Sequence, residues 1–159
     1  FTRFGGHRQA AGLKMPAARV AEFRARVAAY AGERLGPDDL RPVLDMDAAV
    51  TLDELTDETA AEILALAPFG NANPAPLLAL PGAQVARAPE VKSEKHLFVH
   101  LRHAGVTAMA KGWSMAALGA QYRAGDTVDA AVVLEEDTWS RDRGGRPWGL
   151  QLKDLRPAG

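Results

Sequence analysis

The sequence contains no cysteine, which excludes disulfide bonds and thiolate metal sites. No apolar run approaches the roughly 18 residues that a membrane-spanning helix needs. The N-terminus also lacks the charged, apolar and small-residue pattern of a secretory signal. These absences favour a soluble, cytoplasmic protein that does not bind a membrane. Because the chain begins with Phe1 instead of Met, we expect it to be a piece of a longer protein.

Charge of either sign is almost balanced overall, with a net charge of −1, but it is distributed unevenly along the 159 residues. Residues 1–34 carry seven Lys or Arg against two acids, and residues 35–67 carry one Arg against nine acids. A local basic excess can attract a polyanion even when the whole chain is nearly neutral. The alternative is that the basic segment packs beside the acidic one.

The first half of the chain predicts two helices and a short strand. Pro16 suits a first helical turn, and apolar residues at three- and four-residue steps predict a helix of about 18 residues that ends before Gly36. The alternation in residues 41–52 predicts a strand with one solvent-exposed face. Thr51, with Glu54 three residues later, and Thr56 are both suitable N-caps for a second helix, which Pro68 stops. The helix dipole favours acidic residues in the first turns of a helix. We therefore explain the acids of this segment by the dipole and not by a metal site.

The pattern of apolar and polar residues changes after the proline-rich loop "PFGNANPAP" of residues 68–76. Short alternating segments follow, separated by turn residues, and they predict strands over residues 77–88, 95–103, 106–113, 126–136 and 147–156. Five strands, with a short non-strand stretch around "SMAALGAQYRAGD", favour a small barrel of the oligonucleotide-binding (OB) type. We therefore expect an α+β protein with three parts, namely residues 1–67, a linker at 68–76 and a barrel domain at 77–159.

The segment "HLFVHLRH" has three histidines at a spacing that can bind zinc on a helix. Its apolar alternation indicates a half-buried strand instead, which points His103 away from His96 and His100. A three-histidine metal site is therefore not expected. The opposite face of this strand mixes cations with Phe98, so it can bind phosphates and stack a base. The alternative is an ordinary polar barrel exterior.

Three tryptophans lie within residues 113–148 among charged neighbours, which is a composition suited to base stacking. The alternative is that a tryptophan fills the barrel interior, and we expect this of at least one. The opening stretch "RFGGHRQAAG" offers a different chemistry. Gly5 and Gly6 can adopt positive φ and direct backbone amides at an anion, while His7, Arg3 and Arg8 can supply further donors to a phosphate.

No nucleophile and general-base pair, Walker loop or Asp/His cluster for two metals is recognisable in the sequence. The combination of "FGGHRQAAG", a following helix, "LAPFGNANPAP" and a barrel ending in "GLQLKDLRP" closely resembles the C-terminal part of the RecJ exonucleases in the DHH phosphoesterase superfamily. The resemblance covers essentially the whole chain. It departs from the family pattern at Ala72, where the loop usually has a second glycine, and at Lys111, which takes the place of an aromatic.

The resemblance implies the end of an α/β DHH-associated domain, with its helices and short strand, followed by a five-stranded OB-fold barrel. It further implies a multi-domain exonuclease that degrades single-stranded DNA from 5′ to 3′ in recombination and repair. Mn²⁺ or Mg²⁺ would be held by an N-terminal DHH domain outside these residues, with no cofactor in this segment and no activity of the segment alone. The loop at Gly5, Gly6 and His7 would face the scissile phosphate, with His7 in an auxiliary catalytic role and Arg3 and Arg8 binding phosphate.

The barrel would bind single-stranded DNA. The residues predicted to contact it are Lys95, His96, Phe98, His100, Arg102, Lys111, Trp113, Trp139, Arg141, Arg143, Arg146 and Trp148. The main alternative is an interaction module that docks a partner such as the single-stranded-DNA-binding protein. An editing or small-nucleotide phosphodiesterase role within the superfamily is disfavoured by the barrel.

Overall fold

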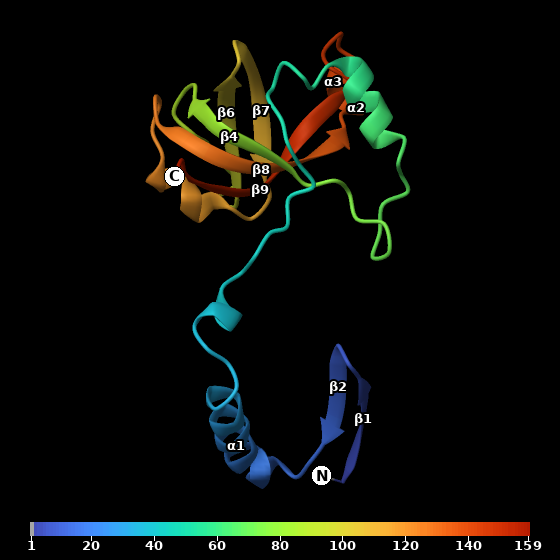
Figure 1. Cartoon of the computed structure of the whole chain (residues 1–159), viewed down its shortest axis with the longest axis vertical. Helices are drawn as coiled ribbons and strands as arrows, with labels where there is room; N and C mark the ends of the chain where they lie inside the picture. Colours follow the sequence, from blue (N-terminus) through green and yellow to red (C-terminus); the bar gives the residue numbers. More distant parts are fainter. Residues whose placement is uncertain (1) are drawn as a thin grey trace. The chain divides into compact units, whose positions relative to one another are not determined.

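The computed structural model describes residues 2–159, and the chain divides into two compact units between Leu44 and Asp45 (Figure 1). Each unit is described by itself. The sequence predicted an α+β protein with a five-stranded OB-type barrel, and the structure confirms this fold class.

The first unit begins with a β-hairpin made of β1 (Arg3–His7) and β2 (Ala10–Lys14). The two strands are antiparallel, with Gly5 opposite Gly12 and Gly6 opposite Ala11. A Cβ on Gly6 would lie 2.5 Å from the carbonyl oxygen of Ala10, so only glycine allows this close approach of the two strands. Gly5 and Gly6 do not have positive φ. The positive φ expected of these two glycines is therefore wrong, because both are part of an extended ladder.

The helix predicted from Pro16 is present as the 3-10 turn η1 (Ala17–Arg19) followed by α1 (Val20–Gly32). A second 3-10 turn, η2 (Asp38–Leu40), follows the helix. The apolar stripe of α1 is largely exposed, including Val20, Val27 and Tyr30. None of residues 2–44 is buried, so this unit has no hydrophobic core in the described chain.

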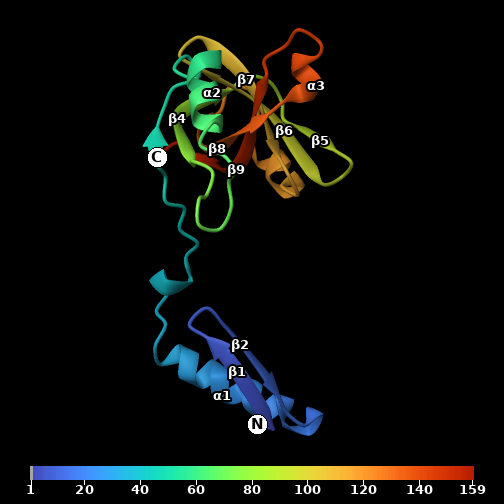
Figure 2. The same cartoon turned by 90° about the vertical axis from the view of Figure 1, so that its right-hand side faces the viewer.

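The second unit is a closed barrel of five strands, and Figure 2 shows β5 and β6 on its right-hand side. They are β4 (Leu78–Val85), β6 (His96–His103), β7 (Val106–Gly112), β8 (Thr127–Glu136) and β9 (Trp148–Pro157). The order is β4, β8, β9, β7, β6, and pairing of β6 with β4 closes the ring. All neighbours are antiparallel except β7 and β9, which are parallel. The five predicted strands are thus confirmed.

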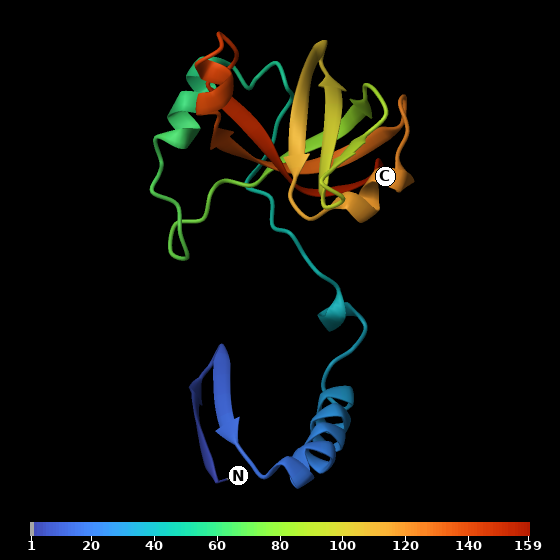
Figure 3. The same cartoon turned by 180° about the vertical axis from the view of Figure 1, so that it is seen from behind.

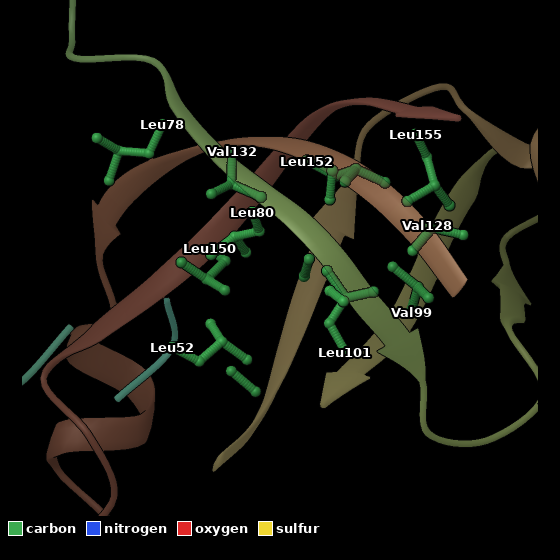
Figure 4. Close-up of a cluster of buried hydrophobic side chains, with 14 of the residues drawn as sticks. Leu52, Leu78, Leu80, Val99, Leu101, Val128, Val132, Leu150, Leu152 and Leu155 are labelled. Carbon is green, nitrogen blue, oxygen red and sulfur yellow. The ribbon is translucent and has the colours of Figure 1, made fainter. Parts of the chain in front are cut away.

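Alternate residues of these strands fill the barrel (Figure 4). On β6, Leu97, Val99 and Leu101 are fully buried while their neighbours reach the surface, as the alternation predicted. Figure 4 shows Leu52, from the segment that precedes the barrel, among leucines and valines of β4, β8 and β9. Burying such side chains is the main favourable term in folding.

Residues 45–67 belong to the barrel unit. β3 (Ala48–Ala49) pairs in parallel with the start of β4, while Leu52, Leu55 and Ala60 are part of the core. The two units therefore divide between Leu44 and Asp45, not at the predicted linker of residues 68–76. The physical reason is that this short segment places its apolar residues on the barrel instead of on the preceding helix.

The predicted strand over residues 41–52 is reduced to the two residues of β3, because Val43, Leu44 and Met46 are exposed and outside any strand. The second helix is α2 (Asp57–Leu64), and Thr56 is its N-cap, accepting from the backbone N–H of Thr59 at 3.1 Å. Glu54 instead accepts from the backbone N–H of Thr51 at 2.7 Å within a turn. The second of the two candidate N-caps is thus the one used.

Three shorter elements complete the barrel unit, namely β5 (Glu90–Lys92), η3 (Ala116–Gln121) and α3 (Thr138–Arg141). β5 pairs antiparallel with β6. Figure 3 shows η3, in light orange, at the end of the yellow strands β6 and β7. It approaches β5 and β6 so closely that a Cβ on Gly119 would lie 2.9 Å from Val91 Cγ2. The predicted non-strand stretch is therefore confirmed as a packed 3-10 turn.

The loop of residues 68–76 is held by Asn73, whose side-chain amide donates to the carbonyl oxygens of Leu66 and Pro68 at 2.9 and 3.1 Å. Ala72, where the family loop usually has glycine, does not have positive φ. Alanine is therefore compatible with the backbone at this position. Within residues 2–159, the helices are all too short or too polar to cross a bilayer.

Leu52 provides a test of the observed domain boundary. Leu52→Ala removes a side chain that is 1% exposed. The variant should lower the free energy of unfolding of the barrel unit by about 2–5 kcal/mol, because burial is lost and a cavity remains. The matched control is Leu66→Ala, since Leu66 is 57% exposed and should cost about 0.5 kcal/mol or less. Denaturant unfolding followed by tryptophan fluorescence measures both effects. Equal, small effects would show that residues 45–67 do not belong to the core.

Candidate nucleic-acid interface

Three aromatic side chains gather on the outer face of β6 and at the end of β7. The rings of His96 and Trp113 are perpendicular, with centroids 4.9 Å apart, and those of Phe98 and Trp113 have the same relation at 6.5 Å. Trp113 is 46% exposed. We call His96, Phe98 and Trp113 the aromatic platform.

Backbone geometry fixes the platform. Strand alternation that buries Leu97 and Val99 directs His96 and Phe98 outward. His96 Nδ1 accepts a hydrogen bond from the backbone N–H of Ser114 at 3.2 Å, next to Trp113. The ring of His96 is thereby oriented beside the indole. In edge-to-face contacts of this kind the edge of one ring packs against the face of the other.

Cations border the platform on β5 and in the connection that precedes it. Lys92 Nζ lies 4.4 Å from the centroid of the Phe98 ring. Arg87 donates from Nε to His100 Nδ1 at 3.0 Å and also forms an ion pair with Glu90 at 3.1 Å. Partial burial, followed by the positive charge of Arg87, lowers the pKa of His100. His100 is therefore held neutral and can accept the Arg87 hydrogen bond.

Lys111 lies directly opposite Phe98 across the β6–β7 pair, yet it is not a free cation. Its Nζ is 2.9 Å from Asp137 Oδ2 and 3.5 Å from Glu135 Oε1. Burial alone would lower the pKa of Lys111, but Asp137 and Glu135 outweigh it and raise that pKa. The hydrogen bond from Lys111, followed by that from the backbone N–H of Ser140, lowers the pKa of Asp137. Lys111 thus has a structural role in holding β7 to the start of α3.

Trp148 is only 5% exposed and lies in the core. Its indole N–H donates to Asp57 Oδ1 of α2 at 2.8 Å, and the Arg146 guanidinium lies 5.1 Å from its ring. Trp148 cannot offer a face to a base, so its predicted contact with DNA is wrong. The expectation that at least one tryptophan fills the barrel is confirmed by this residue.

Trp139 and its neighbours form a second exposed group, in the connection between β8 and β9. Trp139 is 66% exposed, and the Arg143 guanidinium covers its ring at 4.1 Å. Arg141 pairs with Asp142 at 3.6 Å. Contact of these side chains with a DNA strand stays a prediction.

The remaining predicted barrel residues lie toward the far end of β6 and in the turn that precedes it. Arg102 is hydrogen-bonded to Gln84 Oε1 on β4, and Lys95 is exposed in the turn between β5 and β6. His103 points inward, as expected, and its buried Nδ1 has no hydrogen-bond partner in the described chain. No set of three or more potential metal ligands occurs in residues 2–159. The described residues therefore do not fit a Mn²⁺ or Mg²⁺ site.

In the first unit, the predicted phosphate-facing residues all belong to the β1–β2 hairpin. His7 ends β1, and its Nδ1 accepts from the backbone N–H of Gln9 at 3.3 Å in the turn that contains Arg8. Arg3 is at the opposite end of the same strand. Their roles toward a phosphate stay predictions.

Comparison with known proteins identifies this arrangement. The RecJ OB domain family matches residues 46–154, the stretch that contains the barrel, α2 and the platform. The chain belongs to the RecJ OB domain family. This match begins close to the division at Asp45, so it agrees with including residues 45–67 in the RecJ OB domain.

Curated relatives are single-stranded-DNA-specific exonucleases named RecJ. The chain is 34% identical to that of Thermus thermophilus over 154 residues, which cover 97% of this chain and 21% of the relative. It is 32% identical to that of Bacillus subtilis over 101 residues, covering 63% of this chain and 13% of the relative. The chain therefore spans about a fifth or less of the length of these relatives.

Solved structures that match this chain do so at low sequence identity. One is a replication protein A heterotrimer bound to ssDNA, with a TM-score of 0.40 and 11% identity over 52% of this chain and 57% of that chain. Another is a putative aspartyl-tRNA synthetase from Leishmania major, with a TM-score of 0.45 and 12% identity over 84% of this chain and 25% of that chain.

Sequence reasoning did not select Arg87, Glu90 or Lys92 of the RecJ OB domain. They belong to a connection and a three-residue strand, where no periodicity identified a shared face. The register provides the missing information, because Glu90 lies opposite Phe98 and Lys92 opposite His96. A short alternating "EVK" before the stronger strand is the only sequence signal that could have indicated this pairing.

Asp137→Asn should change how the stability of the RecJ OB domain depends on pH. Asparagine keeps the N-cap acceptor for Ser140 but removes the charge that faces Lys111. Because the pKa of Asp137 is lowered in the native state, its contribution is present above about pH 4 and is lost as the pH falls through the native value. Thermal midpoints of wild type and variant should therefore differ at pH 7 and converge at pH 2–3.

Asp142→Asn is the control for Asp137→Asn, since its ion pair with Arg141 is exposed on both sides. It should leave the midpoint unchanged at each pH. An Asp137→Asn midpoint that stays parallel to that of wild type over the whole range would contradict the role assigned to the Lys111 ion pair.

Proposed function

We propose that this chain is the DNA-binding segment of a RecJ-like exonuclease that degrades single-stranded DNA from 5′ to 3′ in the cytoplasm during recombination and repair. The observation that carries the proposal is the aromatic platform, exposed on the outer face of a barrel that belongs to the RecJ OB domain family. The exonuclease names of the curated relatives support the parent activity.

The chemistry of the platform suits a single strand of any sequence. Every base has an aromatic face, so stacking on Trp113 or Phe98 does not require a particular base. The neighbouring Lys92 and Lys95 supply positive charge for the backbone between stacked bases. Duplex DNA hides its base faces, which favours single-stranded over double-stranded ligands.

The hairpin that carries Gly5, Gly6 and His7 would face the scissile phosphate in the full-length enzyme, with Arg3 and Arg8 beside it. Mn²⁺ or Mg²⁺, which would supply the activated water for phosphodiester hydrolysis, would be held by a separate DHH domain. Within this chain, His7 would donate a hydrogen bond to a phosphoryl oxygen, while the barrel would hold the strand.

Replacing Trp113 or Phe98 with leucine should weaken binding of a fluorescein-labelled oligothymidylate. Leucine retains apolar bulk but removes the ring, and loss of one stacked base is worth about 1–3 kcal/mol, or about 5- to 150-fold in Kd. Fluorescence anisotropy at low salt measures this loss. Tyr30→Leu is the control, because Tyr30 is an exposed aromatic of the first unit and lies outside the platform.

Salt separates DNA binding from docking of a protein partner. If the barrel binds phosphates, log Kd should change with log salt by about 0.7 for each neutralised phosphate, whereas an apolar peptide contact would respond little. Unchanged affinity in both leucine variants would place the stacking surface elsewhere. An absence of oligonucleotide binding at low salt would favour the interaction-module alternative.

The chain by itself should leave a 5′-phosphorylated oligonucleotide intact when incubated with Mn²⁺. The physical reason is that residues 2–159 contain no set of three or more side chains suited to a metal ion. Denaturing gel electrophoresis over several hours measures the outcome, with a parallel reaction containing a chelator. Chelator-sensitive degradation that follows the protein through successive chromatography steps would overturn this assignment.

A further inference from the structure

Side chains of β5, β6 and the preceding connection form a continuous series of contacts beside the aromatic platform. Lys92 Nζ is 4.4 Å from the Phe98 ring centroid and 4.0 Å from Glu90 Oε2. The other oxygen of Glu90 is 3.1 Å from Arg87, which also donates to His100. The series Phe98, Lys92, Glu90, Arg87 and His100 thus has an anion at its centre and a cation on each side.

The ring face of Phe98 is occupied by a charge of the protein itself. A cation held over an aromatic ring is stabilised by the ring quadrupole. A base cannot stack on this face while the ammonium group of Lys92 remains there. Lys92 has a flexible four-carbon stem and is about half exposed, so it can leave the ring at small cost when another partner is offered.

The carboxylate of Glu90 occupies the position where a phosphate would meet both cations. Glu90 lies opposite Phe98 in the β5–β6 ladder, and Arg87 and Lys92 both direct charge at it. A phosphodiester carries one negative charge and accepts hydrogen bonds from guanidinium and ammonium groups, as a carboxylate does. His100, held neutral by partial burial and by Arg87, adds no competing charge.

We propose that Arg87 and Lys92 form a phosphate subsite next to Phe98 and that Glu90 occupies it as an internal substitute for phosphate in the free protein. This inference rests on the proposed binding of single-stranded DNA. When a strand binds, a backbone phosphate replaces the Glu90 carboxylate between the two cations. Lys92 then leaves the Phe98 ring for the phosphate, and the adjacent base stacks on the uncovered ring.

Glu90→Gln should therefore tighten binding of oligothymidylate. Exposed ion pairs contribute modestly, so the expected decrease in Kd is about two- to fivefold. Glu94→Gln is the matched control, because it makes the same change in net charge in the turn that follows β5, and no ion pair is seen for Glu94 among the described residues. The effect of Glu94→Gln measures the general electrostatic gain, which the proposal requires to be smaller.

A second probe separates the phosphate subsite from stacking. An abasic oligonucleotide offers phosphates without bases, so Glu90→Gln should tighten its binding too. Phe98→Leu should weaken the binding of oligothymidylate but not that of the abasic oligonucleotide. The double variant Arg87→Gln and Lys92→Gln should weaken the binding of both probes. In that double variant, the additional change Glu90→Gln should give no gain, because the cations through which Glu90 acts are gone.

The outcomes distinguish this inference from the proposed function. If the wild type binds neither probe at low salt, the proposed function fails. If the wild type binds oligothymidylate but Glu90→Gln equals Glu94→Gln, or if the gain persists without Arg87 and Lys92, then the phosphate subsite is overturned alone. Circular dichroism and thermal midpoints confirm that each variant is folded.

Discussion

The pairing of β6 with β4 is the contact on which the rest of the barrel unit depends. It is short, joining Gln84 to Arg102 and Val85 to Leu101, yet it closes the sheet into a ring. Closure fixes which face of β6 points inward, since a sheet that closes on itself has one interior. Leu97, Val99 and Leu101 consequently fill the core, and His96 and Phe98 must face outward. The same strand therefore provides both the stability of the barrel and its binding surface, and a one-residue shift in register would exchange the two.

Period-two alternation was sufficient to predict all five barrel strands, because each has one buried face. The same rule failed for residues 41–52, where Leu44 and Met46 alternate with Val43, Asp45 and Asp47 but are exposed. Only two residues there pair with β4, and the adjacent Leu52 enters the core from a turn. Local pattern does not contain this information, because the partner surface is formed by residues about 30 positions or more later in the chain.

The environment of Trp148 and Lys111 shows why the candidate site was predicted only in part. Both residues were predicted to bind DNA because of their residue type and their charged neighbours in the sequence. Neighbours in the sequence do not show which side chains surround a residue in the folded protein. Asp57 of α2 accepts from the Trp148 indole across 91 residues of chain, and Asp137 pairs with Lys111 across 26 residues. Such long-range partners turn a stacking aromatic and a cation into structural residues. His96, Phe98 and Trp113 contact one another and the nearby Lys92 and Ser114, and these partners leave them on the outer face of the barrel.

The two units differ in the source of their stability, and this bears on how the chain can act. The barrel buries residues from every one of its five strands, whereas none of residues 2–44 is buried. A two-stranded hairpin and a helix of 13 residues are each marginal in water, because the entropy lost on ordering is not offset by burial. The exposed Val20, Val27 and Tyr30 of α1 would gain stability from any surface that covers them. Binding chemistry that needs a fixed geometry therefore belongs on the barrel, where neighbouring strands hold the platform in place. The hairpin of Gly5, Gly6 and His7 can position a hydrogen-bond donor only when further contacts immobilise it.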